Sequence, residues 1–492
     1  MDKEPAAQSP NQPGLSGVEV KRLAAAGVAA VGLRQVAIRA LGLGGTVVLA
    51  RLLLPRDFGA VAVGLTLVSV FGFMGDAGMG AGLIRGPKEP ERGDLASVLG
   101  LQVIVTVALA TATAIIGLQL GLVGRVTALM VASLPIAAFR VPGVIVFERN
   151  LRYQPLVLIE LLETLVYYGW AIATVLLGWG VWGLASASVT RSVVGALIIN
   201  LRSPAGFVAP RISWSRVRPL LSFGLQYQAV SAVSLVRDQG LNVGTAVLAG
   251  IPVLGLWTLA YRILQVPFLL FDSLWRVSFP AMARLLAAGE EPGPILERGL
   301  AVAGLVTGGL LATLVGSAPA LVPAVFGHQW TPVVWVIPWA AAGLMFGGPV
   351  SVATAGYLYA KGDSSSVLVS SLLHTVAWFL VAFPLLSLLG VQALGVGWMA
   401  ASIVETVVLA RRTRRHVPIR VLRHLALPAA LGGVAGTAGW TAASNLGPTV
   451  TSTAAGALVA AAIYGLGMII VQRSLVVDTL ALGRQSLRSL GN

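Results

Sequence analysis

The residues of this sequence that could bind or move an ionic ligand are the charged residues inside its long apolar segments. The arginines among them are Arg34, Arg39, Arg140, Arg191, Arg237, Arg262 and Arg276. The acids are Asp76, Glu160, Glu163, Asp238, Asp272 and Glu405. A charge at the centre of a bilayer costs about 2.5–3.5 kcal/mol on insertion scales, so such a residue usually faces a cavity or an oppositely charged partner. These residues are therefore the candidates for binding an ionic ligand.

The first apolar segment carries two arginines and no acid. Gln35 and Arg39 are four residues apart, which places them on one face of a helix, and Arg34 lies beside them. Because the planar guanidinium group binds phosphate oxygens through two hydrogen bonds at once, these arginines suit an anionic ligand. The alternative is that they reach to the membrane surface or pair with acids on neighbouring helices.

The seventh and eighth apolar segments carry a second group of charges. Arg237 and Asp238 are consecutive, and they form either a local ion pair or part of a ligand site. Asp272 and Arg276 are four residues apart, the spacing of an ion pair within one helix, and here we favour the structural interpretation. Arg262 has no obvious local partner, so it is the better candidate for a cavity.

The remaining acids offer roles in coupling or gating. Glu160 and Glu163 are three residues apart on one helical face. They form either a protonatable coupling site or the partners of Arg140 or Arg191. Asp76 lies within a glycine-rich bend, where we expect it to cap a helix or take part in gating rather than to touch a substrate.

Sequence motifs of enzymes and metal sites are absent. There is no GxxxxGKS/T phosphate loop, no HExxH, no GxSxG and no DxD pair. The sequence contains no cysteine, and its four histidines are scattered. We expect His374 and Glu405 to be single buried polar residues that pack and form hydrogen bonds. The sequence therefore predicts neither an enzyme, nor a metal site, nor a cofactor.

The composition identifies the environment that must hold these charges. Of the 492 residues 56% are hydrophobic and only 11% are charged, whereas soluble domains carry roughly 25% charged residues. Many segments of about 20 residues contain little or no charge, which is the length that a helix needs to cross a bilayer. The short alternating strands of a membrane barrel are not seen. The fold class predicted is an all-α integral membrane protein.

The apolar segments predict about fourteen transmembrane helices. Their ranges are 22–50, 58–83, 94–120, 127–147, 155–177, 181–200, 217–248, 253–283, 298–317, 333–360, 364–388, 391–410, 424–444 and 451–472.

The positions of the basic residues test this segmentation. With the N-terminus in the cytosol, the opposite loops contain three of the 34 Lys and Arg, namely Arg51, Arg56 and Arg125. The loops and tails on the cytosolic side contain most of the others, as the positive-inside rule requires. We therefore expect both termini in the cytosol. The net charge of +15 serves orientation and contact with anionic membrane lipids rather than nucleic-acid binding.

The two halves of the chain resemble each other. TVVLA at 46–50 is repeated as TAVLA at 245–249. Gly59 then aligns with Gly255 if the linker in the second copy is three residues shorter. This pattern predicts two six-helix lobes related by a parallel repeat. The predicted parts are a disordered cytosolic tail without a cleavable signal pattern (1–20), an N-lobe (21–205), a C-lobe (206–415), helices 13 and 14 (416–475) and a second cytosolic tail (476–492).

Several stretches resemble the polysaccharide transporters, or Wzx-type oligosaccharide flippases, of the multidrug/oligosaccharidyl-lipid/polysaccharide exporter superfamily. The first half contains VLARLLLPRDFG, GDAGMGAGLIR, FERNLRYQPLVLIELLETL and GWGVWGLA. The second half contains VLAGIPVLGLWTLAYRILQVP and FPAMARL. The similarity covers roughly residues 22–410 in order. One departure lies near Asn242, where relatives often carry an aspartate, so no ion role is carried over to that position.

This resemblance implies two lobes around a central cavity lined by helices 1, 2, 7 and 8. It implies a bacterial cytoplasmic-membrane flippase that moves undecaprenyl-pyrophosphate-linked oligosaccharide to the outer leaflet for surface polysaccharide assembly. The partners implied are lipid-linked oligosaccharide, membrane lipids and other polysaccharide-assembly proteins. The predicted substrate-binding residues are Arg34, Gln35, Arg39, Arg237, Asp238 and Arg262, and the coupling or gating candidates are Asp76, Glu160, Glu163, Asp272 and Arg276.

Three alternatives stay open. A drug or cation antiporter of the same superfamily would favour acids in the cavity, and the first helix has none. A membrane polysaccharide polymerase or ligase would need larger outer loops. A lipid-binding scaffold would transport nothing.

The turn Pro55–Gly59 between the first two helices is expected to be architectural, with Arg51 and Arg56 as contacts at a gate or rim.

Overall fold

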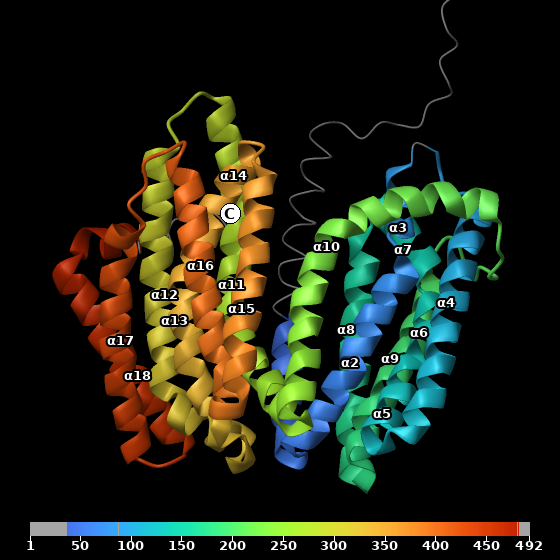
Figure 1. Cartoon of the computed structure of the whole chain (residues 1–492), viewed down its shortest axis with the longest axis horizontal. Coiled ribbons are helices and arrows are strands. Elements are labelled where there is room, and N and C mark those ends of the chain that lie inside the picture. The colour runs from blue at the N-terminus through green and yellow to red at the C-terminus, as the bar shows by residue number, and fades with distance from the viewer. Residues whose placement is uncertain (1–36, 87, 480, 482–492) are drawn as a thin grey trace, which may run out of the picture.

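The structure is a computed structural model that describes residues 37–86, 88–479 and 481. Every secondary-structure element within these ranges is a helix, as predicted (Figure 1). Arg34 and Gln35 lie outside the described residues. The side chains of Asp272 and Arg276 are also outside the description, although both positions belong to a described helix.

The described part of the first half begins with a helix at residues 37–52, and nine further helical elements of different lengths follow. These are α2 (Pro55–Asp76), α3 (Met79–Arg85), α4 (Arg92–Gln119), α5 (Gly121–Val131), α6 (Ser133–Ala138), α7 (Val141–Arg149), α8 (Tyr153–Thr174), the π-helical turn η1 (Val175–Trp179) and α9 (Val181–Arg202).

The second half contains the two longest helices and several interrupted ones. Its elements are α10 (Trp214–Ala249), α11 (Ile251–Ala287), α12 (Gly293–Leu321), η2 (Val322–Phe326), η3 (His328–Trp335), α13 (Val336–Val350), η4 (Ser351–Ala355), α14 (Gly356–Ala360), α15 (Ser364–Leu389), α16 (Gln392–Arg414), α17 (Val421–Asn445) and α18 (Val450–Val471).

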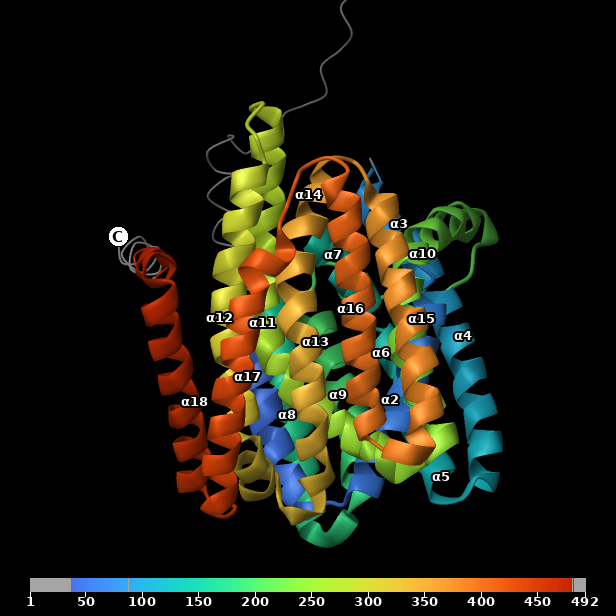
Figure 2. The ribbon, with the colours of Figure 1, turned by 60° about the vertical axis from the view of Figure 1, so that its left-hand side comes forward.

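The helices form two bundles that stand side by side (Figures 1 and 2). One contains α2 to α9 and the other contains α11 to α18, while α10 runs over the top of the first bundle and descends between the two (Figure 1). The bundles meet at the lower end of this view, where residues 37–52, α2 and α11 come together. The repeat and the domain boundaries stay predictions.

Three of the fourteen predicted ranges are broken. The range 58–83 is divided between α2 and α3 at Ala77 and Gly78, which both have positive φ. The other two ranges are more extensively divided. The range 127–147 is divided among α5, α6 and α7, and the range 333–360 among η3, α13, η4 and α14. Prolines lie within or beside these breaks, at Pro135, Pro142, Pro338 and Pro349. Because proline has no N–H to donate and its ring clashes with the preceding turn, it interrupts regular helices.

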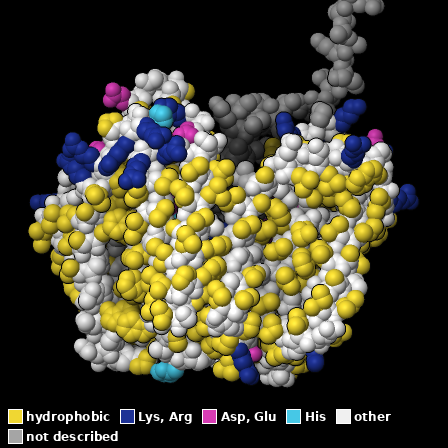
Figure 3. Space-filling view, viewed as in Figure 1, with side chains coloured by type: hydrophobic (Ala, Val, Ile, Leu, Met, Phe, Trp, Pro, Cys, Tyr) yellow, Lys and Arg dark blue, Asp and Glu magenta, His cyan; other side chains and the backbone are white. Residues whose placement is uncertain are grey.

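Each of the other predicted ranges overlaps a described helix. Within the described part of the chain, eleven helices are long and apolar enough to cross a membrane. Residues 37–52, α10 and α17 are helical but are not among these eleven, so the count of fourteen spans stays a prediction. A broad belt of hydrophobic side chains crosses the face of the molecule shown in Figure 3, and Lys and Arg on that face gather mainly at its upper edge.

The lower end is closed by a contact between the N-termini of α2 and α11, which we call the α2–α11 contact. A Cβ atom at Gly59 would lie 1.9 Å from the carbonyl oxygen of Ile251, and one at Gly255 would lie 1.8 Å from that of Pro55. Only glycine permits such a close approach of two backbones. The contact is reciprocal, because each glycine meets the first residue of the other helix and lies four residues after the first residue of its own.

Side chains tie the two bundles together beside the α2–α11 contact. The Arg51 guanidinium donates hydrogen bonds to the carbonyl oxygens of Ala324 and Val325 in η2. In return, Gln329 and Trp330 donate to the carbonyl oxygen of Ala50, at 2.8 and 2.9 Å. Arg51 is therefore a contact between the bundles at the closed end.

Candidate functional site

A cavity of about 860 Å³ lies between the two bundles. Its walls come from residues 37–52, α2, α6, α8, α9, α10 and α11, with Trp378 of α15 at one edge. Four arginines and one carboxylate line it, namely Arg39, Arg140, Arg191, Arg262 and Asp238. A site with this surplus of cations suits a ligand with several negative charges.

Arg262 is positioned by contacts with the first bundle. Its Nη1 donates hydrogen bonds to the hydroxyl oxygens of Thr46 and of Tyr168, the latter at 2.8 Å. Tyr168 packs directly on residues 37–52, because a Cβ atom at Gly45 would lie 2.1 Å from its ring. Glycine at position 45 thus admits the tyrosine whose hydroxyl group holds the guanidinium. Both acceptors are neutral, so the positive charge of Arg262 is left uncompensated by them.

A carboxylate behind the opposite wall holds two more arginines. Glu163 is fully buried, and its oxygens lie 3.1 Å from Nη2 of Arg140 and 3.6 Å from Nε of Arg191. The three residues come from α8, from the break between α6 and α7, and from α9. Gly195 makes room for Glu163, since a Cβ atom there would lie 1.9 Å from Oε1. Two cations share one anion, which leaves a net positive charge at this wall.

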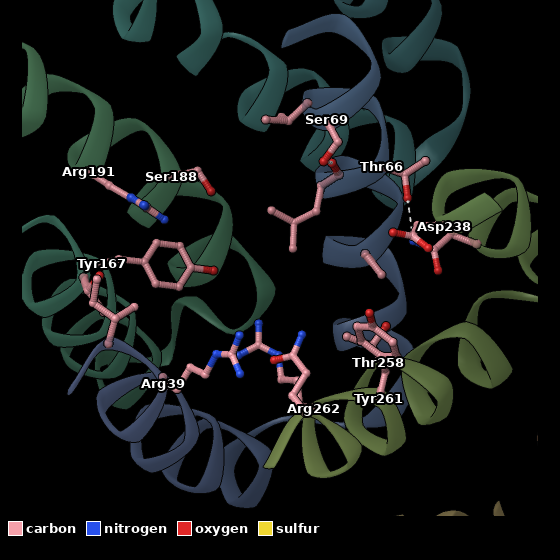
Figure 4. Close-up of a pocket in the computed structure, with 18 of the residues that line it drawn as sticks. Arg39, Thr66, Ser69, Tyr167, Ser188, Arg191, Asp238, Thr258, Tyr261 and Arg262 are labelled. Carbon is pink, nitrogen blue, oxygen red and sulfur yellow. Dashed lines mark hydrogen bonds between the residues drawn. The ribbon is translucent and has the colours of Figure 1, made fainter. Parts of the chain in front are cut away.

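The close-up shows how these walls face each other (Figure 4). Arg39 and Arg262 extend next to each other from neighbouring helices at one edge of the cavity. Arg191, Ser188 and Tyr167 point in from a second edge, and Asp238 stands at the far side (Figure 4). The labelled arginines lie on two edges of the space, Arg191 on one and Arg39 and Arg262 on the other, so a ligand can contact cations from both bundles (Figure 4).

The wall formed by α10 is more polar than positive. Nε of Arg237 lies 2.8 Å from Oδ1 of Asp238, so these neighbours form an ion pair. One turn further, Asn242 donates a hydrogen bond of 3.2 Å to the hydroxyl oxygen of Thr66 on α2. Asp238 and Asn242 line the cavity, whereas Arg237 supports it from behind. This wall links α10 to the first bundle through a neutral contact that can break cheaply.

Asp76 and Glu160, two further coupling or gating candidates whose side chains are described, are not among the residues that line the cavity. Asp76 accepts hydrogen bonds from the backbone N–H of Gly78 and from Nε2 of Gln228, so it closes the α2–α3 break and ties it to α10. Glu160 lies on α8, one turn from Glu163. Among the described residues there is no group of three or more His, Cys, Asp or Glu able to hold a metal ion.

The structure joins two residues that we expected to be isolated. Nδ1 of His374 on α15 lies 2.9 Å from Oε2 of Glu405 on α16. Sequence reasoning treated the two separately because they lie on different helices, and nothing in the sequence gives the relative register of those helices.

Sequence reasoning also missed most of the neutral polar lining. Tyr167, Tyr168, Thr66, Ser188 and Asn242 all contribute to the cavity. Hydroxyl and amide groups are common in transmembrane helices and carry no charge, so they gave no signal comparable to that of arginine. A search for polar residues repeated on one face of α8 and of α9 would have found part of this set.

Comparison with known proteins identifies related sequences. The family described as polysaccharide biosynthesis protein matches residues 48–335. The lipopolysaccharide biosynthesis protein WzxC of Escherichia coli (strain K12) is 26% identical over an alignment of 324 positions, and the match covers 62% of this chain and 63% of WzxC. The matched part is thus less than two thirds of that relative's length.

Comparison with solved structures identifies the fold. The lipid II flippase MurJ in an inward closed conformation has a TM-score of 0.71 and 14% identity, covering 90% of this chain and 99% of MurJ. An inward-facing multidrug resistance MATE family transporter of the MOP superfamily has a TM-score of 0.53 and 16% identity, covering 78% of this chain and 97% of the other. The chain therefore has the all-helical fold of these membrane transporters.

Proposed function

We propose that this chain, which belongs to the family of polysaccharide biosynthesis proteins, is a flippase that moves undecaprenyl-pyrophosphate-linked oligosaccharide from the inner to the outer leaflet of the bacterial cytoplasmic membrane. The glycan serves the assembly of a surface polysaccharide. The named activities among the similar proteins are those of a lipid II flippase and of multidrug transporters, which supports a transporter rather than an enzyme.

The observation that carries the proposal is that four arginines line one cavity between the bundles. A pyrophosphate group presents several oxygens and at least two negative charges, and guanidinium groups bind such oxygens in a bidentate manner. Arg39 and Arg262 approach it from one edge and Arg191 from another (Figure 4). The polyprenyl tail stays in the lipid while the charged head group occupies the cavity.

Movement across the membrane follows from alternating closure of the two ends. The α2–α11 contact closes the end that we assign to the outer face, so the described state loads from the cytosol. Binding has to be strong enough to load the substrate and weak enough to release it. Several arginines, each partly engaged by Glu163, Thr46 or Tyr168, meet this requirement better than one tight site.

The test is complementation of a strain that lacks the gene, with leaflet-resolved analysis of its lipid-linked oligosaccharides. The double variant Arg39→Gln with Arg262→Gln should leave the lipid-linked oligosaccharide in the inner leaflet. Arg262→Lys should retain part of the export, because it keeps the charge but loses the planar fork. Arg125→Gln is the matched control, since Arg125 is exposed on α5 and does not line the cavity. Full export by the double variant at normal expression would refute the proposal.

The same experiment separates the alternatives. A drug antiporter would change drug resistance and leave the leaflet distribution of the glycolipid unchanged. A polymerase or ligase would leave unpolymerised oligosaccharide that already faces outward. The positive cavity favours the flippase over a cation exporter, because cationic drugs would meet four arginines and one carboxylate among the lining residues.

A further inference from the structure

Asp238 is the feature of the cavity that an anion site alone does not explain. It is the one carboxylate among the described lining residues, and it stands at the far side of the space from Arg191 (Figure 4). Nε of Arg237 occupies Oδ1 of Asp238 at 2.8 Å, yet the Asp238 side chain remains 44% exposed. A carboxylate at membrane depth is costly and repels phosphate, so its exposure in the cavity calls for a ligand group that it attracts.

Two amides accompany this carboxylate on α10. Gln239 and Asn242 also line the cavity, and they lie within about one helical turn of Asp238. Nδ2 of Asn242 donates hydrogen bonds to Thr66 at 3.2 Å and to Oε1 of Gln239 at 3.4 Å. The hydrogen bonds among the described residues leave Oδ2 of Asp238 and Oδ1 of Asn242 without a donor. Two such acceptors on one wall suit a ligand with hydroxyl groups, because a hydroxyl donates to carboxylate and amide oxygens alike.

An aromatic ring adjoins this wall from α11. Tyr261, Arg262 and Gln265 lie on one face of that helix, and all three line the cavity. The Tyr261 ring packs on the buried rings of Trp257 and Trp398, with centroids 5.9 and 6.0 Å apart. The faces of an aromatic ring carry partial negative charge and attract C–H groups. A pyranose ring presents such C–H groups on one face and hydroxyl groups at its edge, so Tyr261 and the α10 wall together match its two kinds of surface.

The order of these groups fits a sugar that is joined directly to a phosphate. Tyr261 and Arg262 are consecutive residues, and both line the cavity. In the close-up Tyr261 lies between Arg262 and Asp238, while Arg39 lies on the other side of Arg262 (Figure 4). A pyrophosphate held by Arg39 and Arg262 therefore has the tyrosine ring and then the carboxylate at one end. The sugar attached at that end is the part of the ligand that meets them.

We propose that Asp238, Asn242 and Tyr261 form a subsite for the sugar next to the pyrophosphate, through which the cavity selects a glycosylated pyrophosphate over a bare one. This inference rests on the proposed flippase function. Asp238 and Asn242 accept hydrogen bonds from the sugar hydroxyl groups, and Tyr261 packs on the C–H face of the ring. A bare pyrophosphate has a free terminal phosphate with up to about one more negative charge, which Asp238 repels. Selectivity thus combines an attraction for one ligand with a repulsion of the other, and the lipid carrier without a glycan is rejected.

The test compares soluble probes that differ by one sugar. The full chain in phosphatidylcholine nanodiscs is titrated by calorimetry with uridine diphosphate and, separately, with uridine diphosphate linked to glucose, galactose or N-acetylglucosamine. All probes contain the uridine, so the ratio of their affinities reports the sugar and the free terminal phosphate. At least one of the three sugar nucleotides should bind to the wild-type protein about ten-fold more tightly than uridine diphosphate, the size expected for one hydrogen bond to a charged group.

Variants separate selection of the sugar from simple packing. Asp238→Asn removes the charge and keeps the shape, so it should bind uridine diphosphate more tightly than the wild type does, and its preference for the sugar nucleotide should fall to about two-fold or less. Tyr261→Leu should lower the same preference, because the ring is lost. The matched controls are Asp478→Asn and Tyr153→Leu, which should keep the wild-type preference. Asp478 pairs with Arg298, Tyr153 is exposed at the start of α8, and neither lines the cavity.

The outcomes distinguish this inference from the proposed function. If the wild-type protein binds uridine diphosphate and all three sugar nucleotides with equal affinity, the sugar subsite is wrong and the anion site stands. A variant that retains the wild-type preference excludes its residue from the subsite. If the wild-type protein binds none of the probes, the anion site and the subsite built on it are both wrong. Should one variant fail to fold, the other alone decides, because each substitution removes a separate part of the subsite.

Discussion

The close backbone contact at the glycines of the α2–α11 contact predicts that a larger residue there would favour opening of the lower end. In Gly255→Ala the new Cβ would lie 1.8 Å from the carbonyl oxygen of Pro55 and 2.9 Å from the backbone nitrogen of Gly59. Both neighbours are backbone atoms and cannot turn aside, so α11 has to withdraw by roughly 1.5 Å to reach an ordinary contact distance. Overpacking of this kind typically costs about 1–3 kcal/mol. Because the strain exists only while this end is closed, it shifts the equilibrium toward the open state by about 5- to 150-fold.

The assay uses the absence of cysteine from the chain. A single thiol introduced by Thr258→Cys lies on the cavity wall one turn beyond Gly255. It should react slowly with a membrane-impermeant maleimide added to intact cells, and clearly faster when Gly255→Ala is present. A separate Arg125→Cys protein tests the expected outward orientation of this end, because Arg125 is exposed on α5 near the same end.

The control is Gly299→Ala, since a Cβ atom at that position of α12 meets nothing within 4 Å. Gly59→Ala should act like Gly255→Ala, because its Cβ would lie 1.9 Å from the carbonyl oxygen of Ile251. Equal labelling rates for Gly255→Ala and Gly299→Ala would refute the reasoning that backbone contact at these glycines closes the cavity.

Three further changes have defined outcomes. Gly195→Ala should displace Glu163 from its two arginines and reduce export of the glycolipid in the complementation assay, and normal export would contradict the role of that carboxylate. Arg51→Gln removes hydrogen bonds worth about 1 kcal/mol at an exposed position and should speed labelling of the Thr258→Cys thiol several-fold, whereas an unchanged rate would exclude it as a latch. Hydrogen bonds from Ser366 hold the pKa of Asp363 below its usual range. The stabilisation of the start of α15 by the Asp363 carboxylate should be complete above the usual pKa and be lost as the pH falls through the lowered one. The protection of the Ser366 amide, measured relative to its intrinsic exchange rate at each pH, should therefore fall in acid in the wild type but not in Asp363→Asn.

Charge and length predicted the class of protein and part of the site. Apolar stretches of about 20 residues are sufficient for the all-helical membrane fold, because few other structures satisfy the backbone in lipid. Arg39, Asp238 and Arg262 were recognised because an ionised group at that depth needs a cavity or a partner, and all three line the cavity.

The remaining features depend on how helices cross, which a single sequence does not contain. The bonds from Arg262 to Thr46 and Tyr168 join residues separated by 216 and 94 positions. The pair of His374 and Glu405 requires one specific register between α15 and α16. Prolines marked the breaks in the range 127–147, but prolines also lie inside continuous helices such as α11, so proline alone does not locate a break.

The turns that precede α2 and α11 differ in backbone conformation, and this difference explains why only the first turn carries an arginine. The match of TVVLA with TAVLA pairs Arg51 with Gly250. Gly250 has φ of +90°, a conformation that residues with a side chain rarely adopt, so the second turn has no place for an arginine. Arg51 lies in the last turn of the helix at residues 37–52 and donates hydrogen bonds to the carbonyl oxygens of Ala324 and Val325 in the other bundle. The close backbone contact is therefore shared equally by the two halves, whereas the side-chain latch belongs to the first half alone. The positive-inside pattern predicts few basic residues at this end of the molecule. Closure of the cavity therefore explains why Arg51 lies there, and orientation in the membrane does not.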